Sequence, residues 1–422
     1  MENNPAVSKP EPSTVFRWTL LVLISLAMFG NYYIYDSISP LADLLAKQLH
    51  FTDSDIGLLQ GIYSVPNVFM VLIGGIIIDK IGTRVSTFLF ALLCLVGAII
   101  TASFSTLTMM AAGRLIFGLG AESLIVAVTT VIGRWFKGRQ LSFAFGVNLT
   151  IARLGSFAAL NSPSWANTYF DNWRNPMLIS VAAGVICVVA AIIYWGMDAY
   201  AEKNMAVREV PKQDEIKFKE IFSFSGSYWF VVMLCITFYS AIFPFQTFAV
   251  KFFMETHGAT REFGGFLSSM LTLSAMILTP LFGLFVDHIG KRSLLMMIGS
   301  VILVPVYLLM AYTSVSLYVP MALMGLSFSL IPAVMWPSVA IIVSEEKLGT
   351  AYGLMTMIQN IGLAGFNFLI GWANDFSGGY TMGMWIFSSL GFFGLLFAFL
   401  LRRSELSPKG HGLEKGMEKA SA

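Results

Sequence analysis

The chain has 422 residues, of which 56% are hydrophobic and only 12% are charged, with a net charge of +2. Soluble domains carry about 25% charged residues, so this composition excludes a soluble protein and predicts one that lies in a lipid bilayer. Cys94, Cys187 and Cys235 all lie in apolar runs, and the four histidines are scattered. We therefore expect no disulfide framework, no metal site, no catalytic residue and no cofactor.

Apolar runs follow one another along almost the whole chain. About 20 residues are needed to cross about 30 Å of hydrocarbon, and the chain divides into twelve runs of about that length. They are expected at residues 16–38, 55–78, 85–104, 108–133, 140–162, 177–197, 228–250, 262–286, 293–313, 316–343, 350–372 and 381–401. The predicted fold class is therefore an all-α membrane protein with twelve transmembrane helices.

One long polar stretch, residues 198–222, divides these spans six and six. The predicted domains are an N-terminal tail, a first six-helix bundle, a linker, a second six-helix bundle and a C-terminal tail, at residues 1–15, 16–197, 198–222, 223–401 and 402–422. Twelve spans place both termini on the same side of the membrane. If that side is the cytoplasm, it holds most of the 26 Lys and Arg residues, as expected because basic loops are retained there.

A ten-residue pattern, G-x-x-x-D-x-x-G-x-R, occurs after the second span and again after the eighth, at an offset of 208 residues. Its members are Gly75, Asp79, Gly82 and Arg84 in the first copy and Gly283, Asp287, Gly290 and Arg292 in the second. The second glycine of each copy permits a tight turn, and each Asp can accept hydrogen bonds from the start of a neighbouring helix. We predict that the two copies form a cytoplasmic gate that couples the halves. The alternative is a pair of basic loops that only set the topology.

The doubled pattern, in a chain of twelve spans, resembles the cytoplasmic signature of the major facilitator superfamily. The resemblance implies a transporter with two six-helix bundles and a substrate cavity between them near the middle of the membrane. It also implies alternating access by rocking of the two halves. Lys80 and His288 stand where the signature often has Arg, so its basic character is kept.

Four charged side chains are expected within the spans, where charges are costly and often functional. Helical rise places Asp36 and Arg114 near the outer boundary, where Arg114 could extend to the surface, and both are as readily structural as functional. Glu122 and Arg153 rise about 18 and 21 Å from the turn between their spans, to matching depth. We predict that they bind substrate, the carboxylate receiving a cation and the guanidinium an anion. A buried ion pair joining the two spans is the alternative.

The second half lacks this charged pair, because Glu122 corresponds to Ser329 and Arg153 to Asn360 at an offset of 207 residues. The asymmetry favours a substrate with one cationic and one anionic end, held by the first half, while the second supplies neutral hydrogen bonds and aromatic walls. Weaker candidates for lining the same site are Tyr32, Tyr33, Tyr35, Tyr239, Gln246, Trp336, Gln359 and Asn360. Packing is the commoner role for side chains of these types within spans.

A narrower resemblance covers residues 113–156 and the shorter segments 29–36 and 63–67. Three stretches carry it, Ala121-Glu122-Ser123, Trp135-Phe136-Lys137-Gly138 and Ala152-Arg153-Leu154-Gly155-Ser156. They are similar to the corresponding positions of the family of lysosomal dipeptide transporters. The resemblance implies dipeptide uniport, with Glu122 near the amino terminus of the peptide and Arg153 near its carboxylate.

The chain departs from the animal members of that family outside these stretches. Its first outer loop lacks their Cys-bearing insertion, and Asn148-Leu149-Thr150 lies inside a span, where it cannot be glycosylated. We therefore expect a prokaryotic inner membrane rather than a lysosome, and no glycosylated accessory subunit.

These observations predict a secondary transporter of small zwitterionic solutes, dipeptides above all, that works by alternating access as a uniporter. A proton-coupled symporter or antiporter of another small organic anion or amino acid is the alternative within transport. A receptor or scaffold would leave the doubled gate unexplained, and an enzyme would need a reactive cluster that the sequence lacks. The expected partners are the small-molecule substrate and the lipid bilayer, with no nucleic acid.

Overall fold

The computed structural model describes residues 9–136, 140–206, 224–344 and 347–415, and every regular element in these ranges is helical. The α-helices are α1 (Thr14–Asp36), α2 (Ala42–Leu49), α3 (Asp53–Gly61), α4 (Ser64–Ser103), α5 (Leu107–Phe136), α6 (Leu141–Leu160), α7 (Ser162–Trp165), α8 (Arg174–Asn204), α9 (Gly226–His257), α10 (Arg261–Ile289), α11 (Arg292–Tyr312), α12 (Tyr318–Ile342), α13 (Leu348–Ser377) and α14 (Thr381–Glu405). Two short 3-10 helices lie at Ser39–Leu41 and Asn167–Tyr169. The predicted all-α fold class is confirmed.

Eleven helices in the described ranges are long and apolar enough to cross a membrane. The twelve predicted spans become eleven because α4 contains parts of two of them, joined at Gly82, whose φ of 80° and ψ of 163° are not helical. Only a residue without a Cβ adopts this conformation readily. The predicted span 55–78 is itself interrupted, because its first residues belong to α3 and the chain turns at Ile62 and Tyr63 before α4 begins.

The predicted linker starts within a helix, because α8 continues to Asn204. Asp198 is fully buried there, and its carboxylate accepts hydrogen bonds from Arg84 at 2.6 Å, Arg134 at 3.0 Å and Trp135 at 3.2 Å. These contacts join α8 to α4 and α5, so this part of α8 belongs to the first bundle. The rest of the predicted linker, residues 207–222, and parts of both predicted tails lie outside the described residues.

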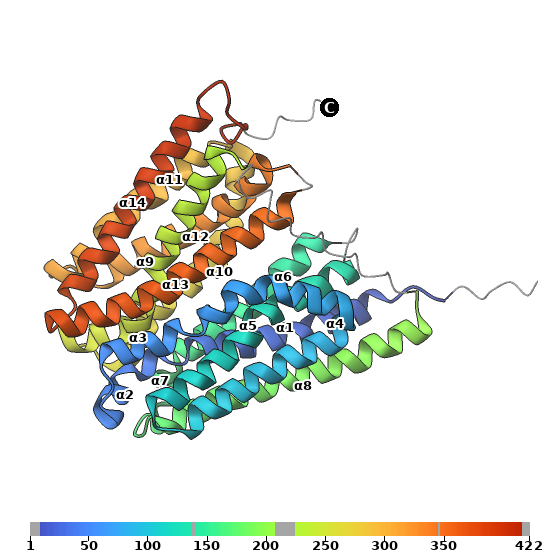
Figure 1. The fold of residues 1–422 in the computed structure, drawn as a ribbon, viewed down its shortest axis with the longest axis horizontal. Helices are drawn as coiled ribbons and strands as arrows, with labels where there is room; N and C mark the ends of the chain where they lie inside the picture. Colours follow the sequence, from blue (N-terminus) through green and yellow to red (C-terminus); the bar gives the residue numbers. More distant parts are fainter. Residues whose placement is uncertain (1–8, 137–139, 207–223, 345–346, 416–422) are drawn as a thin grey trace, which may run out of the picture.

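The helices form two bundles that meet at one end of the molecule (Figure 1). In the first bundle α1 packs on α6 and α8, and α4 packs on α5 and α8. In the second, α9 packs on α13 and α14, and α10 and α11 pack on α12. The bundles lie close together near α2, α3 and α7 and diverge toward the end where α14 finishes (Figure 1). We call these the closed end and the open end.

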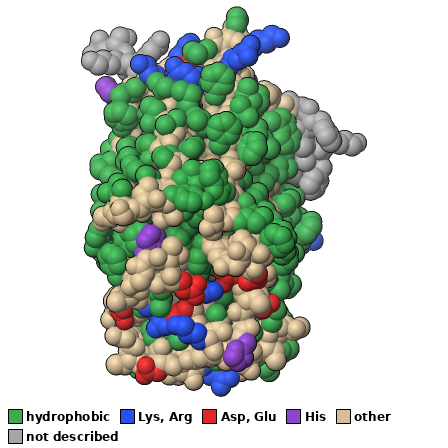
Figure 2. All heavy atoms as spheres, turned by 90° about the vertical axis from the view of Figure 1, so that its left-hand side faces the viewer, with side chains coloured by type: hydrophobic (Ala, Val, Ile, Leu, Met, Phe, Trp, Pro, Cys, Tyr) green, Lys and Arg blue, Asp and Glu red, His purple; other side chains and the backbone are tan. Residues whose placement is uncertain are grey.

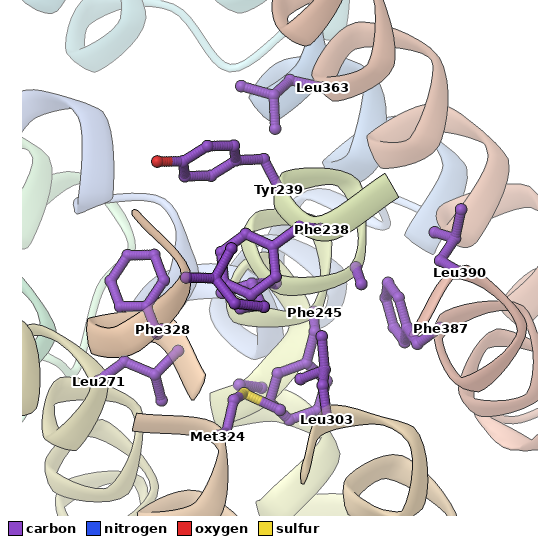
Figure 3. Packing of buried hydrophobic residues seen from close by; sticks show 14 of the residues in the cluster. Phe238, Tyr239, Phe245, Leu271, Leu303, Met324, Phe328, Leu363, Phe387 and Leu390 are labelled. Carbon is purple, nitrogen blue, oxygen red and sulfur yellow. The ribbon is translucent and has the colours of Figure 1, made fainter. Parts of the chain in front are cut away.

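Close backbone packing holds the two bundles together at the closed end. The main contact is made by α3 on α13. A Cβ on Gly57 would collide with the backbone carbonyl of Asn367, so only glycine allows α3 to approach α13 this closely. Elsewhere each bundle has its own hydrophobic core, and Figure 3 shows part of the core of the second, around Phe245 and Leu303.

Ion pairs reinforce the same end. Acidic and basic side chains lie together low on the face that Figure 2 shows, below a largely hydrophobic surface. Asp43 of α2 pairs with Arg261 of α10 at 2.5 Å, and Asp53 at the start of α3 pairs with Lys251 of α9. Asp375 near the end of α13 accepts hydrogen bonds from the backbone N–H groups of Asp53 at 2.9 Å and Ser54 at 2.7 Å. These bonds satisfy two of the donors that a helix start leaves free.

Candidate functional site

A cavity of about 310 Å³ lies between the two bundles, with walls from α1, α5 and α6 of the first and α9, α10, α12 and α13 of the second. Its lining residues are Asn31, Tyr32, Tyr35, Asp36, Tyr63, Phe117, Ala121, Glu122, Ile125, Arg153, Ser156, Tyr239, Phe243, Gln246, Thr272, Phe328, Trp336, Thr356, Gln359 and Leu363. Every charged residue among them belongs to the first half. This is the asymmetry that the sequence predicts.

Glu122 and Arg153, the two principal predicted residues, both line this cavity and are half-buried. Within the described parts of the chain, neither side chain forms an ion pair or a hydrogen bond, so the ion pair considered as the alternative is absent from this structure. The Arg153 guanidinium instead lies over the rings of Tyr32, at 5.3 Å, and Phe328, at 5.6 Å. Ring faces attract a cation without using its N–H donors, so those donors remain available to a ligand.

Most of the weaker candidates also face the cavity. Tyr32, Tyr239, Gln246, Trp336 and Gln359 are lining residues. The Trp336 indole donates a hydrogen bond to the Tyr239 hydroxyl at 3.0 Å, which fixes both rings on the second-half wall. Figure 3 shows Tyr239 at the edge of the hydrophobic core, with its hydroxyl directed away from the other labelled side chains.

Tyr33 and Asn360 are placed away from this cavity. Tyr33 is buried between the first bundle's own rings, Phe29 at 6.4 Å and Trp165 at 6.5 Å. Asn360 is 1% exposed and donates to the backbone carbonyl of Thr356 at 3.1 Å. Neither side chain is among the residues that line the wall.

Asp36, which was expected near the outer boundary and as readily functional as structural, is the last residue of α1 and lines the cavity. Its side chain is buried, forms no ion pair with any described residue, and lies near enough to Arg114 and Arg153 for their charges to act on it. Spacing could have identified it, because Tyr32, Tyr35 and Asp36 are three and four residues apart and therefore share one face of α1.

Arg114 has a structural role, and the expectation that it extends to the surface is wrong. It is 1% exposed and donates to the backbone carbonyls of Ile34 at 3.0 Å, Tyr35 at 3.3 Å and Leu59 at 3.1 Å, and to the Gln60 side chain at 2.9 Å. The last carbonyls of a helix lack intrahelical partners, so the guanidinium satisfies the end of α1 and joins it to α3.

The two copies of the repeated pattern lie at the open end. Gly82 and Gly290 both have positive φ, 80° and 69°. Arg84 binds Asp198 and Glu202 of α8, within its own half, while Arg292 pairs at 2.8 Å with Asp287 of its own loop. Asp79 is exposed. In the part of the chain that the structure describes, no ion pair joins one copy to the other, so the predicted gate stays a prediction.

A family model described as Major Facilitator Superfamily matches residues 24–251 and 229–421. The chain belongs to this superfamily. It is therefore an integral, multi-pass membrane transporter of a small-molecule substrate and not an enzyme. This agrees with the family predicted from the doubled pattern.

Curated relatives and solved structures extend the comparison. The chain is 32% identical to the lysosomal dipeptide transporter MFSD1 of Danio rerio, over 82% of this chain and 78% of that one. It is 29% identical to the protein of the same name from Homo sapiens, over 95% and 89%. Among solved structures it resembles a mutant of the nucleoside transporter NupG, with a TM-score of 0.74, 15% identity and coverage of 90% and 98%. It also resembles a bacterial homologue of the human lysosomal transporter Spinster in an inward-facing and occupied conformation, with a TM-score of 0.72, 16% identity and coverage of 93% and 98%.

Proposed function

We propose that this protein transports dipeptides in their zwitterionic form, by alternating access and as a uniporter. The observation that carries the proposal is the state of Glu122 and Arg153, which face one cavity without pairing with each other. A charge within a membrane protein is costly unless it is compensated. A zwitterion brings both compensating charges at once.

The cavity walls suit such a ligand. In this proposal the carboxylate of Glu122 receives the peptide ammonium, and the forked donors of Arg153 bind the peptide carboxylate. The neutral amide of the ligand then meets the neutral second-half wall, where Tyr239, Gln246 and Gln359 offer hydrogen bonds. The relatives named dipeptide transporters support the same substrate class.

Alternating access is supported by the difference between the two ends. The bundles are joined at the closed end and diverge at the open end (Figure 1), so the cavity has a route out on one side. In a rocking cycle, the ion pairs of the closed end break as the repeated patterns of the open end come together. We propose that the open end, which carries both termini, faces the cytoplasm, because most Lys and Arg residues lie on that side.

We keep a prokaryotic inner membrane, without a glycosylated accessory subunit, as part of the proposal. It rests on the short first outer loop and on the absence of a glycosylation sequence outside the spans. A reporter enzyme that works only in the cytoplasm, fused after residue 422, tests the orientation. We expect the reporter to be active. An inactive reporter on a correctly inserted chain would mean that the protein has the opposite orientation.

Uptake of radiolabelled Ala-Ala into proteoliposomes tests the transport proposal. We expect faster uptake than into empty vesicles, with competition by unlabelled Ala-Leu. Acetyl-Ala-Ala and Ala-Ala-amide each lack one of the two end charges, so neither should compete. Competition by both blocked peptides would show that the end charges are not recognised, and absence of any dipeptide uptake would refute the substrate class.

A pH-sensitive dye inside the same vesicles separates uniport from proton coupling. Uniport predicts that dipeptide uptake leaves the internal pH unchanged. Acidification in step with uptake would instead favour the proton-coupled alternative, in which Glu122 carries the proton. Radiolabel uptake is measured on the same vesicles, so an unchanged internal pH counts as uniport only where dipeptide uptake is seen.

A further inference from the structure

A second cavity of about 330 Å³ adjoins the first and shares four lining residues with it, Arg153, Tyr239, Phe328 and Trp336. It lies between α6 of the first half and α10 and α12 of the second. Its remaining lining residues come from the parts of these helices nearer the open end. The second cavity therefore continues from Arg153 toward the open end.

The walls of the two cavities differ in chemistry. Asp36 and Glu122 line only the first cavity. The walls of the second are mostly apolar and include Ala275, Met276 and Pro332, and Arg153 is its one charged lining residue among the described parts of the chain. Arg153 thus stands at the junction between a polar compartment and an apolar one.

We propose that the second cavity binds the C-terminal side chain of the transported dipeptide and selects apolar or aromatic side chains at that position. The inference rests on the proposed function, in which the peptide ammonium lies at Glu122 and the carboxylate at Arg153. The N-terminal residue of the peptide then lies wholly within the first cavity. The C-terminal residue lies at the junction, where the adjoining free space has apolar walls.

Burial of an apolar side chain in such a space gains free energy with the area removed from water. The gain is larger at the C-terminal position, because the wall of the first cavity around the N-terminal side chain carries Asp36, Asn31 and Glu122 beside its aromatic and aliphatic residues. Two dipeptides of the same composition and opposite order should therefore bind differently. This is a property that the end charges alone do not predict.

Binding to the unmodified protein gives the first test and needs no substitution. Affinities are measured by titration for Ala-Gly, Ala-Leu and Ala-Phe and for the reversed peptides Gly-Ala, Leu-Ala and Phe-Ala. We expect Ala-Phe to bind at least tenfold more tightly than Ala-Gly, with less than a threefold change across the reversed series. Equal changes in the two series would overturn the inference.

Filling the second cavity gives the second test. A Cβ on Gly146, which lines this cavity, would meet no atom within 4 Å, so the side chain of Gly146→Leu starts in free space on the cavity wall. Ala275→Leu narrows the cavity from the opposite wall. Each should weaken Ala-Phe at least fivefold relative to Phe-Ala. The matched control is Gly196→Leu on α8, where a Cβ also has free space but which lines neither cavity; it should leave the ratio unchanged.

The isomer ratio keeps the two proposals apart. A variant that only blocks the movement of the halves weakens uptake of both isomers equally. If Gly146→Leu and Ala275→Leu each weaken binding of Ala-Phe and of Phe-Ala by the same factor, the inference is overturned while the proposed function stands. If the unmodified, folded protein binds none of the six peptides, the proposed function is wrong and the inference falls with it. Each variant reports independently, so failure of one to fold leaves the other decisive.

Discussion

The charged side chains of the closed end and those of the cavity have opposite surroundings. At the closed end Asp43 and Asp53 each pair with a basic residue of the other half, Arg261 and Lys251. In the cavity Glu122 and Arg153 lie at neighbouring positions without pairing. Both sets are largely shielded from water, so the difference is not one of burial.

We interpret the paired charges as holding the two halves together and the unpaired charges as kept for a ligand. An ion pair that spans the two halves stabilises one arrangement of them, because each charge is already compensated by the other. A charge without an ion-pair partner keeps an uncompensated cost of burial, which a ligand of opposite charge would offset.

Removal of either cavity charge should abolish transport. A hydrogen bond to a charged group contributes about 1.5–3 kcal/mol, so Glu122→Gln and Arg153→Ala should each weaken dipeptide binding roughly ten- to a hundredfold. Thermal-shift titration with Ala-Ala and proteoliposome uptake measure the two losses. Arg174→Ala is the control, because Arg174 is exposed and lines no cavity described above. Normal uptake by either cavity variant would remove that residue from the site.

Loss of an ion pair at the closed end should shift the balance between the arrangement in which this end is closed and the one in which it is open. Lys251→Met leaves Asp53 without its basic partner, and for a partly exposed pair this costs about 1–2 kcal/mol, which corresponds to roughly a tenfold rise in the population opened at this end. Spin labels on cysteines at exposed His50 and Thr256, one in each half, measure the separation. The three native cysteines are buried.

The control for this shift is another lysine of the same end. Lys47→Met removes a side chain that pairs with Asp43 four residues earlier in the same helix, so it does not span the halves. We expect its distance distribution to match that of the unmodified protein. Equal shifts in both variants would mean that surface charge in general, rather than the pair across the halves, sets the balance.

Substitution of Asp36 should reduce uptake less than substitution of Glu122, although both residues are carboxylates that line the cavity. A zwitterion has no net charge, so loss of a charge near Arg153 acts on the two ends of the ligand in opposite directions. We expect Asp36→Asn to change Ala-Ala uptake less than about threefold, roughly 0.7 kcal/mol. A loss as large as that of Glu122→Gln would show instead that Asp36 receives the peptide ammonium.

Substitution of Tyr33 should have the smallest effect on dipeptide affinity. Its ring packs against Phe29 and Trp165, away from the cavity, so Tyr33→Phe keeps the packing and should leave Ala-Ala affinity unchanged within about twofold, roughly 0.4 kcal/mol. The same titration on Tyr32→Leu, which removes a ring from the Arg153 guanidinium, should show weaker binding. If the two variants bound Ala-Ala equally well, the assignment of Tyr32 to the cavity face of α1 and of Tyr33 to another face would be wrong.

The sequence predicted the depth of residues better than the direction in which they point. Glu122 and Arg153 could be found because helical rise alone places them near the middle of the membrane. Tyr33 was included with Tyr32 because counting along a helix does not say which face meets the other bundle. Asp36 was not predicted to line the cavity, because nothing in the sequence shows that the cavity extends to the last turn of α1.

Local breaks in the helices also needed three-dimensional information. Hydropathy alone predicts a single span over 55–78, yet the chain turns at Ile62 and Tyr63 so that α3 can lie against α13 of the other half. Asp198 looked like the start of a solvated linker, and its partners Arg84 and Arg134 lie more than sixty residues away in the chain. Contacts between such distant segments cannot be derived from the local pattern.

The position of Arg153 links ligand binding to movement of the halves. Its guanidinium lies between a ring of its own half, Tyr32, and a ring of the other half, Phe328. Each such attraction contributes about 0.5–2 kcal/mol, and only the one to Phe328 changes when the bundles move apart. A carboxylate bound to the same guanidinium neutralises the charge and weakens its attraction to both rings. In the proposed alternating-access cycle, loading the site lowers the cost of separating Phe328 from Arg153, and we expect an occupied carrier to reorient more easily than an empty one.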